Sequence, residues 1–170
     1  MEKKGWSWSK TSLLSVFLTQ APLLFITSLP AQLGIWASED GVTVLGPLAL
    51  IGTIIAIIGI LFETVGDSQL NAFRANPANK GKVLDTGLWR YTRHPNYFGD
   101  ACTWWGIWLI ACETGLAGWI SIIGPIFLTF TLTRWSGKPL LERGMKKTRP
   151  EYADYVTRTS GFFPLPPKRK

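Results

Sequence analysis

Four long apolar blocks divide the chain, with polar stretches between them. The blocks cover residues 11–29, 44–62, 98–111 and 118–133. A helix needs about 20 mostly apolar residues to cross the hydrocarbon core of a bilayer, so each block approaches the length of one span. The pattern predicts an all-α, multi-pass transmembrane bundle of about four spans, built as one membrane domain over residues 1–170.

The polar stretches predict where helices continue and where they end. Pro30 is expected to close the first helix and to be followed by a loop over residues 31–43. The second helix is expected to continue through residues 63–74, because this stretch has no proline and only one glycine. Another helix is expected to begin at Pro95, since the first turn of a helix tolerates proline. Residues 134–170 are expected to form an amphipathic tail with one or two helices near the membrane.

The positive charge is confined to one set of polar stretches. The net charge is +7, and all 18 Lys and Arg residues fall within 3–10, 74–93 and 134–170. Because basic residues gather in cytoplasmic loops, both termini, the loop 63–97 and the tail 134–170 are predicted to be cytosolic. The same distribution predicts a lipid bilayer as a partner and argues against nucleic acid. It does not separate a bacterial inner membrane from the endoplasmic reticulum.

Neither a disulfide nor a metal site is expected. Cys102 and Cys112 lie about 15 Å apart along one predicted helix. A disulfide requires Cα atoms within about 7 Å, so these two cysteines cannot pair with each other. One histidine and two separated cysteines also fall short of a metal ligand set.

Polar side chains that suit ligand binding lie at two predicted helix ends. One group is the stretch GLWRYTRHPNYFGD over residues 87–100, and the other is a stripe along residues 63–74. Helical spacing places these side chains on two faces, namely Asn96, Asp100 and Trp104 on one helix and Glu63, Asp67, Asn71 and Arg74 on the other. An acid near the membrane boundary is costly unless it has a partner or lines a cavity, so the two groups predict one polar pocket. The residues alone also allow the arginines to be topology markers and the stripe to be a solvated helix face.

These motifs resemble those of a known superfamily. The likeness rests on Glu63, Asp67, Gln69, Phe73 and Arg74, on residues 87–91 and 93–100, and on residues 149–152 and 163–164. In these positions the chain resembles the steroid 5-alpha-reductase superfamily, in a branch of largely uncharacterised, DUF1295-like membrane proteins. The shorter Arg-His-Pro-x-Tyr pattern is also similar in sterol reductases and in isoprenylcysteine-type methyltransferases.

The resemblance implies an NADPH-dependent oxidoreductase. In such reductases NADPH enters from the cytosol and gives a hydride to a conjugated enone, so a lipid-soluble small molecule is the implied substrate. The implied cofactor-binding residues are Glu63, Asp67, Arg74, Tyr91, Arg93, His94, Asn96, Tyr97, Asp100 and Trp104. In the better-known reductases the Tyr and Glu that polarise the substrate carbonyl lie in helices that precede the start of this chain. The catalytic residues therefore stay unassigned, and a short form or a fragment with the cofactor half of the site is expected.

Two other functions remain open at this point. One is an S-adenosylmethionine-dependent methyltransferase of the isoprenylcysteine type, which would favour paired glutamates in the tail, whereas Glu142 has no adjacent acid. The other is a non-catalytic membrane subunit that binds the helices of a partner. The stripe of Glu63, Asp67 and Arg74 favours the reductase.

Overall fold

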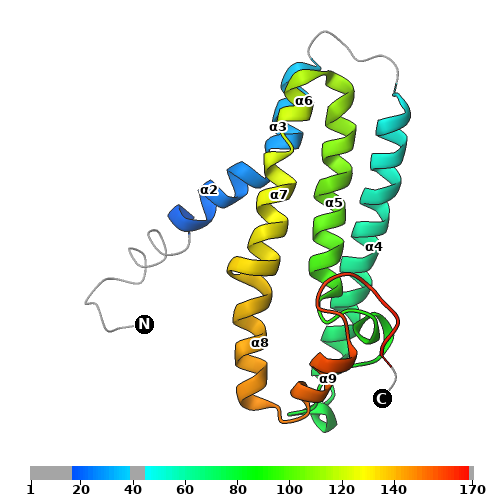
Figure 1. Ribbon diagram of the computed structural model, residues 1–170, viewed down its shortest axis with the longest axis vertical. Helices are drawn as coiled ribbons and strands as arrows, with labels where there is room; N and C mark the ends of the chain where they lie inside the picture. Colours follow the sequence, from blue (N-terminus) through cyan, green and yellow to red (C-terminus); the bar gives the residue numbers. More distant parts are fainter. Residues whose placement is uncertain (1–16, 39–44, 169–170) are drawn as a thin grey trace, which may run out of the picture.

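A computed structural model describes residues 17–38 and 45–168, which fold into helices joined by short turns (Figure 1). The all-α prediction is confirmed, since the described residues contain helices and one isolated β-bridge between Thr92 and Ser160. The α-helices are α2 (Leu18–Thr27), α3 (Leu29–Ala37), α4 (Pro47–Ala75), α5 (Pro95–Ala111), α6 (Leu116–Ile120), α7 (Ile123–Phe130), α8 (Gly137–Thr148) and α9 (Tyr152–Arg158). A π-helical segment, Thr131–Trp135, joins α7 to α8, and short 3-10 turns occur at Pro77–Asn79, Gly87–Arg90 and Cys112–Thr114.

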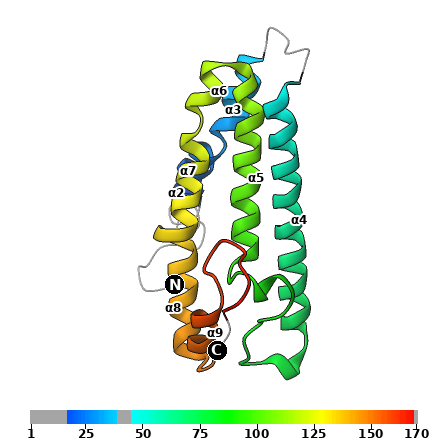
Figure 2. The ribbon, with the colours of Figure 1, turned by 45° about the vertical axis from the view of Figure 1, so that its right-hand side comes forward.

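Three long rods lie side by side and run in alternating directions. Helix α4 runs from one end of the molecule to the other, α5 returns beside it, and α6, α7 and α8 follow one another back along the bundle (Figures 1 and 2). The end of α4, the start of α5 and the end of α8 therefore meet at the same end of the bundle. The small helix α9 and residues 159–168 cover this end.

Two helices within the described residues are long and apolar enough to cross a membrane. They are Pro47–Ala75 and the continuous rod Leu116–Thr148. Their apolar side chains face outward, since Ile51, Ile54, Ile58 and Leu61 of α4 are between 43% and 56% exposed. Lipid, rather than water, suits an apolar surface of this extent. These helices indicate a membrane protein.

The prediction of about four spans is not confirmed by the described residues, in which two helices meet the length and composition of a span. Helix α5 has 17 residues, which give about 25 Å at the α-helical rise and fall short of a hydrocarbon core of about 30 Å. The first apolar block breaks at Ser28 into α2 and α3, and its residues 11–16 lie outside the described ranges. The cytosolic placement of the loop, tail and termini stays a prediction.

Proline explains which predicted helix ends are right and which are wrong. Helix α5 begins at Pro95, and α4 continues through residues 63–74, both as predicted. The loop predicted over 31–43 is wrong for its described part, because Pro30 lies in the first turn of α3 and that helix continues to Ala37. A proline that ends one helix can equally begin the next, since its missing N–H has no partner in a first turn.

Glycines allow α4 and α5 to approach closely. Gly52 and Gly59 of α4 face Gly106 and Gly99 of α5, respectively. A Cβ atom added at Gly59 would lie 2.5 Å from the carbonyl oxygen of Gly99. Small residues at a helix interface permit this close backbone packing in membrane proteins. The contact fixes the register that sets the polar stripes of the two helices side by side.

A carboxylate from a distant segment caps the first turn of α4. The backbone N–H of Ala49 donates a hydrogen bond to Oε1 of Glu113 at 3.1 Å. The first four N–H groups of a helix have no partner within it, so this bond satisfies one of them. We expect Glu113→Ala to lower the free energy of unfolding by about 1 kcal/mol, measured by denaturant titration in detergent micelles. Glu113→Gln retains an acceptor oxygen, and an equal loss in this control would contradict the capping role.

Candidate functional site

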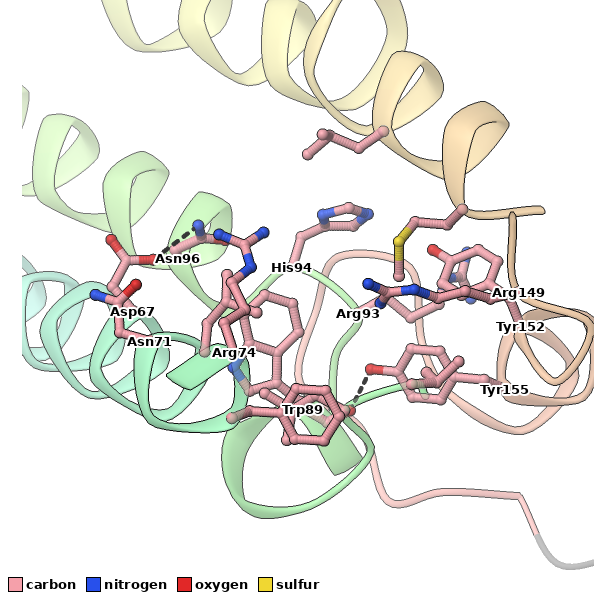
Figure 3. A pocket seen from close by; sticks show the side chains of 16 residues that line it. Asp67, Asn71, Arg74, Trp89, Arg93, His94, Asn96, Arg149, Tyr152 and Tyr155 are labelled. Carbon is pink, nitrogen blue, oxygen red and sulfur yellow. Dashed lines mark hydrogen bonds between the residues drawn. The ribbon is translucent and has the colours of Figure 1, made fainter. Parts of the chain in front are cut away.

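A cavity of about 360 Å³ lies where α4 ends and α5 begins. Four parts of the chain form its walls (Figure 3). They are the last turns of α4, residues 83–96, Leu141 and Met145 of α8, and α9 together with Arg149, which precedes it. This is the size of a small-molecule pocket. The cavity sits at the end of the bundle that residues 159–168 cover.

The α4 wall and the α5 wall are joined by a side-chain hydrogen bond. Nδ2 of Asn96 donates to Oδ1 of Asp67 at 3.0 Å, and Oδ1 of Asn96 accepts from the backbone N–H of Tyr97 at 3.0 Å. These two bonds fix the orientation of the Asn96 amide. Arg74, two turns beyond Asp67 on α4, lines the same cavity beside Asn96 (Figure 3). Part of each polar group that the sequence placed on a separate helix therefore lines one pocket, namely Asp67, Asn71 and Arg74 of α4 and Asn96 of α5.

Arg93 holds the α5 end of the site against α8 and α9. Its side chain is 8% exposed, and Nε donates to Oε1 of Glu142 at 2.9 Å. Nη1 donates to the carbonyl oxygens of Val156, at 3.1 Å, and of Thr159. A buried charge is tolerated only when it is paired and hydrogen-bonded, and Arg93 meets both conditions. The ion pair with Glu142 neutralises its charge, so the first role of Arg93 is to connect distant segments.

His94 belongs to the same network. Its Nε2 lies 3.2 Å from Oε1 of Glu142, and its ring stacks on that of Tyr97 with centroids 5.1 Å apart and planes 7° apart. Glu142 thus receives contacts from two consecutive residues of the motif. Tyr97 itself stacks on His94 and does not line the cavity.

Two other arginines leave positive charge in the cavity. Arg74 comes from the end of α4, and Arg149 comes from the turn between α8 and α9. Among the residues described, neither forms an ion pair with a carboxylate. Figure 3 shows Arg74 beside Asn96 and Arg149 beside Tyr152, on opposite sides of the pocket. The cavity therefore offers two separated guanidinium groups for an anionic ligand.

Buried aromatic residues form the floor of the cavity. Trp89 donates from Nε1 to the carbonyl oxygen of Gly66 at 3.0 Å, and its own carbonyl oxygen accepts a hydrogen bond from the hydroxyl of Tyr155. Tyr152 is only 3% exposed, and burial, with the Glu142 carboxylate nearby, raises the pKa of its hydroxyl to about 12. The Tyr152 hydroxyl therefore stays protonated at neutral pH and can donate a hydrogen bond.

The structure brings together half of the residues that the sequence assigned to the cofactor. Five of them line the cavity, namely Asp67, Arg74, Arg93, His94 and Asn96. The other five lie outside it, namely Glu63, Tyr91, Tyr97, Asp100 and Trp104. Tyr91 is 43% exposed, and its carbonyl oxygen accepts from the N–H of Leu165 at 3.0 Å. Asp100 and Trp104 line a different cavity, next to α2 and α7.

Sequence reasoning missed the wall that the tail contributes. Leu141 and Met145 of α8 and Tyr152 and Tyr155 of α9 line the cavity. Their spacing of four and three residues places each pair on one helix face, which was the available signal. The tail was instead interpreted as an element of the membrane surface, because its many basic residues dominate its composition.

Comparison with known proteins places the chain in a family. The model for the family described as "Protein of unknown function (DUF1295)" matches residues 1–159. No solved structure matches the chain.

Several curated proteins are similar over part of the chain. A probable O-methyltransferase, ustE, of Ustilaginoidea virens is 32% identical over 122 residues, which are 68% of this chain and 42% of that protein. A Delta(14)-sterol reductase of Gibberella zeae is 34% identical over 90 residues, covering 44% of this chain and 18% of that protein. The 3-oxo-5-alpha-steroid 4-dehydrogenase 1 of Mus musculus is 31% identical over 102 residues, covering 60% of this chain and 36% of that protein.

The matched region is less than half the length of each of these relatives. Sterol and steroid reductases are nevertheless among them, which confirms the resemblance drawn from the motifs. The chain is similar to a 3-oxo-5-alpha-steroid 4-dehydrogenase over part of its length. Because the family model matches nearly the whole chain, the chain belongs to the DUF1295 family.

Proposed function

We propose that the cavity between α4, α5, α8 and α9 binds NADPH, and that the protein reduces a carbon–carbon double bond in a steroid-like or other lipid enone. The observation that carries the proposal is the pair of arginines without carboxylate partners among the described residues, Arg74 and Arg149, on opposite sides of one pocket. Guanidinium groups suit phosphate because their planar fork donates paired, charge-assisted hydrogen bonds. The similarity to sterol and steroid reductases supports the same reaction class.

The remaining lining residues suit the other parts of a dinucleotide. The Asn96 amide, fixed by Asp67, presents a rigid polar group at the α5 wall. The protonated hydroxyl of Tyr152 adds a donor near Arg149. Bound NADPH would supply the hydride, and the protein would orient the cofactor and balance its charge.

The charge of the cavity argues against S-adenosylmethionine. The lining carries Arg74, Arg93 and Arg149 against Asp67, and Glu142 neutralises Arg93. The remaining excess is positive, which suits the phosphates of a dinucleotide better than a sulfonium cation. The similarity to ustE makes the methyl donor the ligand to test beside NADPH.

Ligand-dependent stability tests the proposal directly. The purified full chain in detergent is titrated with NADPH, NADH and S-adenosylmethionine, and thermal unfolding is followed. A ligand that binds only the folded protein adds about 2.7 kcal/mol of stability at one hundred times its dissociation constant. We expect NADPH to raise the unfolding temperature. A shift with S-adenosylmethionine alone would overturn the proposal, and no shift with any of the three would favour a non-catalytic subunit.

Arginine variants locate the bound phosphates. We expect Arg149→Ala and Arg74→Ala each to weaken NADPH binding roughly 10- to 150-fold, since a hydrogen bond to a charged group contributes about 1.5 to 3 kcal/mol. The affinity is measured from the NADPH dependence of the unfolding temperature. Arg143→Ala is the matched control, because Arg143 is an exposed residue of α8 outside the cavity lining. Unchanged affinity in both pocket variants would remove the phosphate role.

A further inference from the structure

A surface cleft of about 620 Å³, here called the basic cleft, lies at the same end of the bundle as the candidate site. Three segments that are far apart in the sequence form it, namely residues 85–90, the last residue of α9, Arg158, and residues 167–168. The cavity of the candidate site shares no described lining residue with it. The basic cleft is therefore a separate place where a ligand can bind.

The charged side chains of the basic cleft leave an excess of positive charge. Arg90, Arg158 and Lys168 line it, and Asp85 supplies the one carboxylate among its described lining residues. Nη2 of Arg158 donates to Oδ2 of Asp85 at 2.7 Å, so these two charges balance. Arg90 and Lys168 are exposed, and in the described part of the chain neither forms an ion pair. Two cations therefore remain for an anionic ligand.

Hydrogen bonds between the three segments hold the walls of the basic cleft together. The backbone N–H of Lys168 donates to the carbonyl oxygen of Arg158 at 2.9 Å. Nε of Arg158 donates to Oδ2 of Asp154 at 2.9 Å, which together with the bond to Asp85 fixes the guanidinium plane. The backbone N–H of Leu165 donates to the carbonyl oxygen of Tyr91, the residue after Arg90, at 3.0 Å. The fold thus brings the basic side chains together.

The segment that ends in Lys168 also carries exposed apolar side chains. Phe163 is 65% exposed and Leu165 is 56% exposed. The centroid of the Phe163 ring lies 6.1 Å from that of Phe98, in the first turn of α5, and residues 159–168 run from α9 to the start of α5 and back (Figure 1). Five residues span at most about 18 Å, so Lys168 lies within that distance of Phe163. The basic cleft is therefore close to the end of an apolar helix.

Exposed aromatic and basic side chains that lie close together are typical of a membrane surface. Aromatic side chains favour the interface between lipid and water. Basic residues just outside the hydrocarbon region attract anionic headgroups. A phosphate monoester carries up to two negative charges and three terminal oxygens, which match the two cations of Arg90 and Lys168. Arginine donates paired hydrogen bonds to phosphate, and lysine adds a point charge.

We propose that the basic cleft binds the phosphate of an anionic lipid headgroup. Arg90 and Lys168 contact the phosphate, and Phe163 and Leu165 lie in the adjoining lipid. The bound headgroup would hold the segment 159–168 at the membrane surface. This binding requires no nucleotide and no reaction, so it is independent of the proposed function.

The test uses phosphatidic acid, whose headgroup is a phosphate monoester, and the purified full chain in detergent micelles without nucleotide. Native mass spectrometry counts the bound lipid molecules, and a titration gives the dissociation constant. We expect one phosphatidic acid to bind more tightly than phosphatidylcholine, whose headgroup has no net charge. The double variant Arg90→Gln, Lys168→Gln is expected to weaken phosphatidic acid binding roughly tenfold or more.

A matched control removes the same charge from another surface. The double variant Lys146→Gln, Lys147→Gln replaces two exposed lysines of α8 outside the basic cleft, and it is expected to retain the affinity. All four replaced side chains are exposed, so neither double variant disturbs a buried contact. An equal loss of affinity in the two double variants would overturn the proposal.

A change of charge in the opposite direction gives a second test. Asp85→Asn removes the carboxylate from the basic cleft and leaves Arg158 without that partner, so phosphatidic acid is expected to bind severalfold more tightly. Glu151→Gln makes the same change of net charge at an exposed residue outside the cleft, and it is expected to leave the affinity unchanged. An equal effect of both substitutions would contradict a defined site.

A soluble competitor separates a lipid headgroup from a free phosphate compound. Glycerol 3-phosphate has the headgroup chemistry of phosphatidic acid without the acyl chains. We expect it to displace phosphatidic acid only in large excess, because it lacks the lipid part that lies beside Phe163 and Leu165. If it bound as tightly as phosphatidic acid, the basic cleft would be a site for a soluble phosphate compound, and the lipid assignment would be wrong.

Discussion

Glu142→Ala is expected to lower the free energy of unfolding by about 3 to 5 kcal/mol, because it leaves a buried arginine without its counter-charge. Oε1 of Glu142 contacts both Nε of Arg93, at 2.9 Å, and Nε2 of His94, at 3.2 Å. The loss is measured by denaturant titration of the protein in detergent. Glu151→Ala removes an exposed carboxylate near the same end of the molecule, and this control is expected to change stability by less than about 0.5 kcal/mol.

A double-mutant cycle separates the ion pair from simple truncation. Arg93→Ala alone removes the same interaction and also leaves the carbonyl oxygens of Val156 and Thr159 without their donor. The Arg93→Ala, Glu142→Ala double variant removes both charges, so its loss is expected to be smaller than the sum of the single losses by about 0.5 to 3 kcal/mol. Strictly additive losses would contradict the coupling. Arg93 variants are therefore expected to change the stability of the fold. A loss of ligand binding in such a variant would not by itself show that Arg93 contacts the ligand.

Gly59→Ala is expected to destabilise the protein strongly, because the added methyl group has no room between α4 and α5. The added Cβ would lie 2.5 Å from the carbonyl oxygen of Gly99 and 2.6 Å from the backbone nitrogen of Thr103, and neither atom can move without shifting α5. Overpacking usually costs about 1 to 3 kcal/mol, and a clash with backbone lies at or above the upper end of that range. Thermal unfolding in detergent, followed by circular dichroism, measures the loss.

Gly144→Ala is the matched control, because it makes the same substitution within a helix. A Cβ at Gly144 would meet no atom within 4 Å. Alanine is a better helix former than glycine by about 1 kcal/mol, so this variant is expected to be slightly more stable than the parent protein. If Gly59→Ala were also neutral or stabilising, the close packing of α4 and α5 would be refuted.

The parts of the fold that the sequence predicted correctly depend on local signals. The start of α5 follows from Pro95, and the length of α4 follows from the absence of proline up to Ala75. Helix α3 was missed because a single proline, Pro30, is compatible with both the end and the start of a helix. Local signals also do not show that the apolar block after Gly118 continues through a π-helical turn into α8.

The candidate site was predicted where helical periodicity was sufficient. Asp67 and Asn96 were placed on facing stripes, and they are hydrogen-bonded in the structure. Periodicity also placed Asp100 on the face of Asn96, correctly, but it could not show which neighbouring helix covers each turn of that face. The pairing of Arg93 with Glu142 joins residues 49 positions apart, and no spacing rule selects one carboxylate for an arginine at that distance.

The same long separation bears on how the protein is made in the cell. The residues of α4 and α5 are synthesised before Glu142. Arg93 is therefore part of the nascent chain before the carboxylate that pairs with it exists. The backbone bonds from Arg93 to Ser160 and from Leu165 to Tyr91 form later still. Packing of α4 against α5 and completion of the pocket are consequently separate stages of folding. Translation order leaves the cavity at this end of the bundle without its α8 and α9 walls until residues 142–165 have docked.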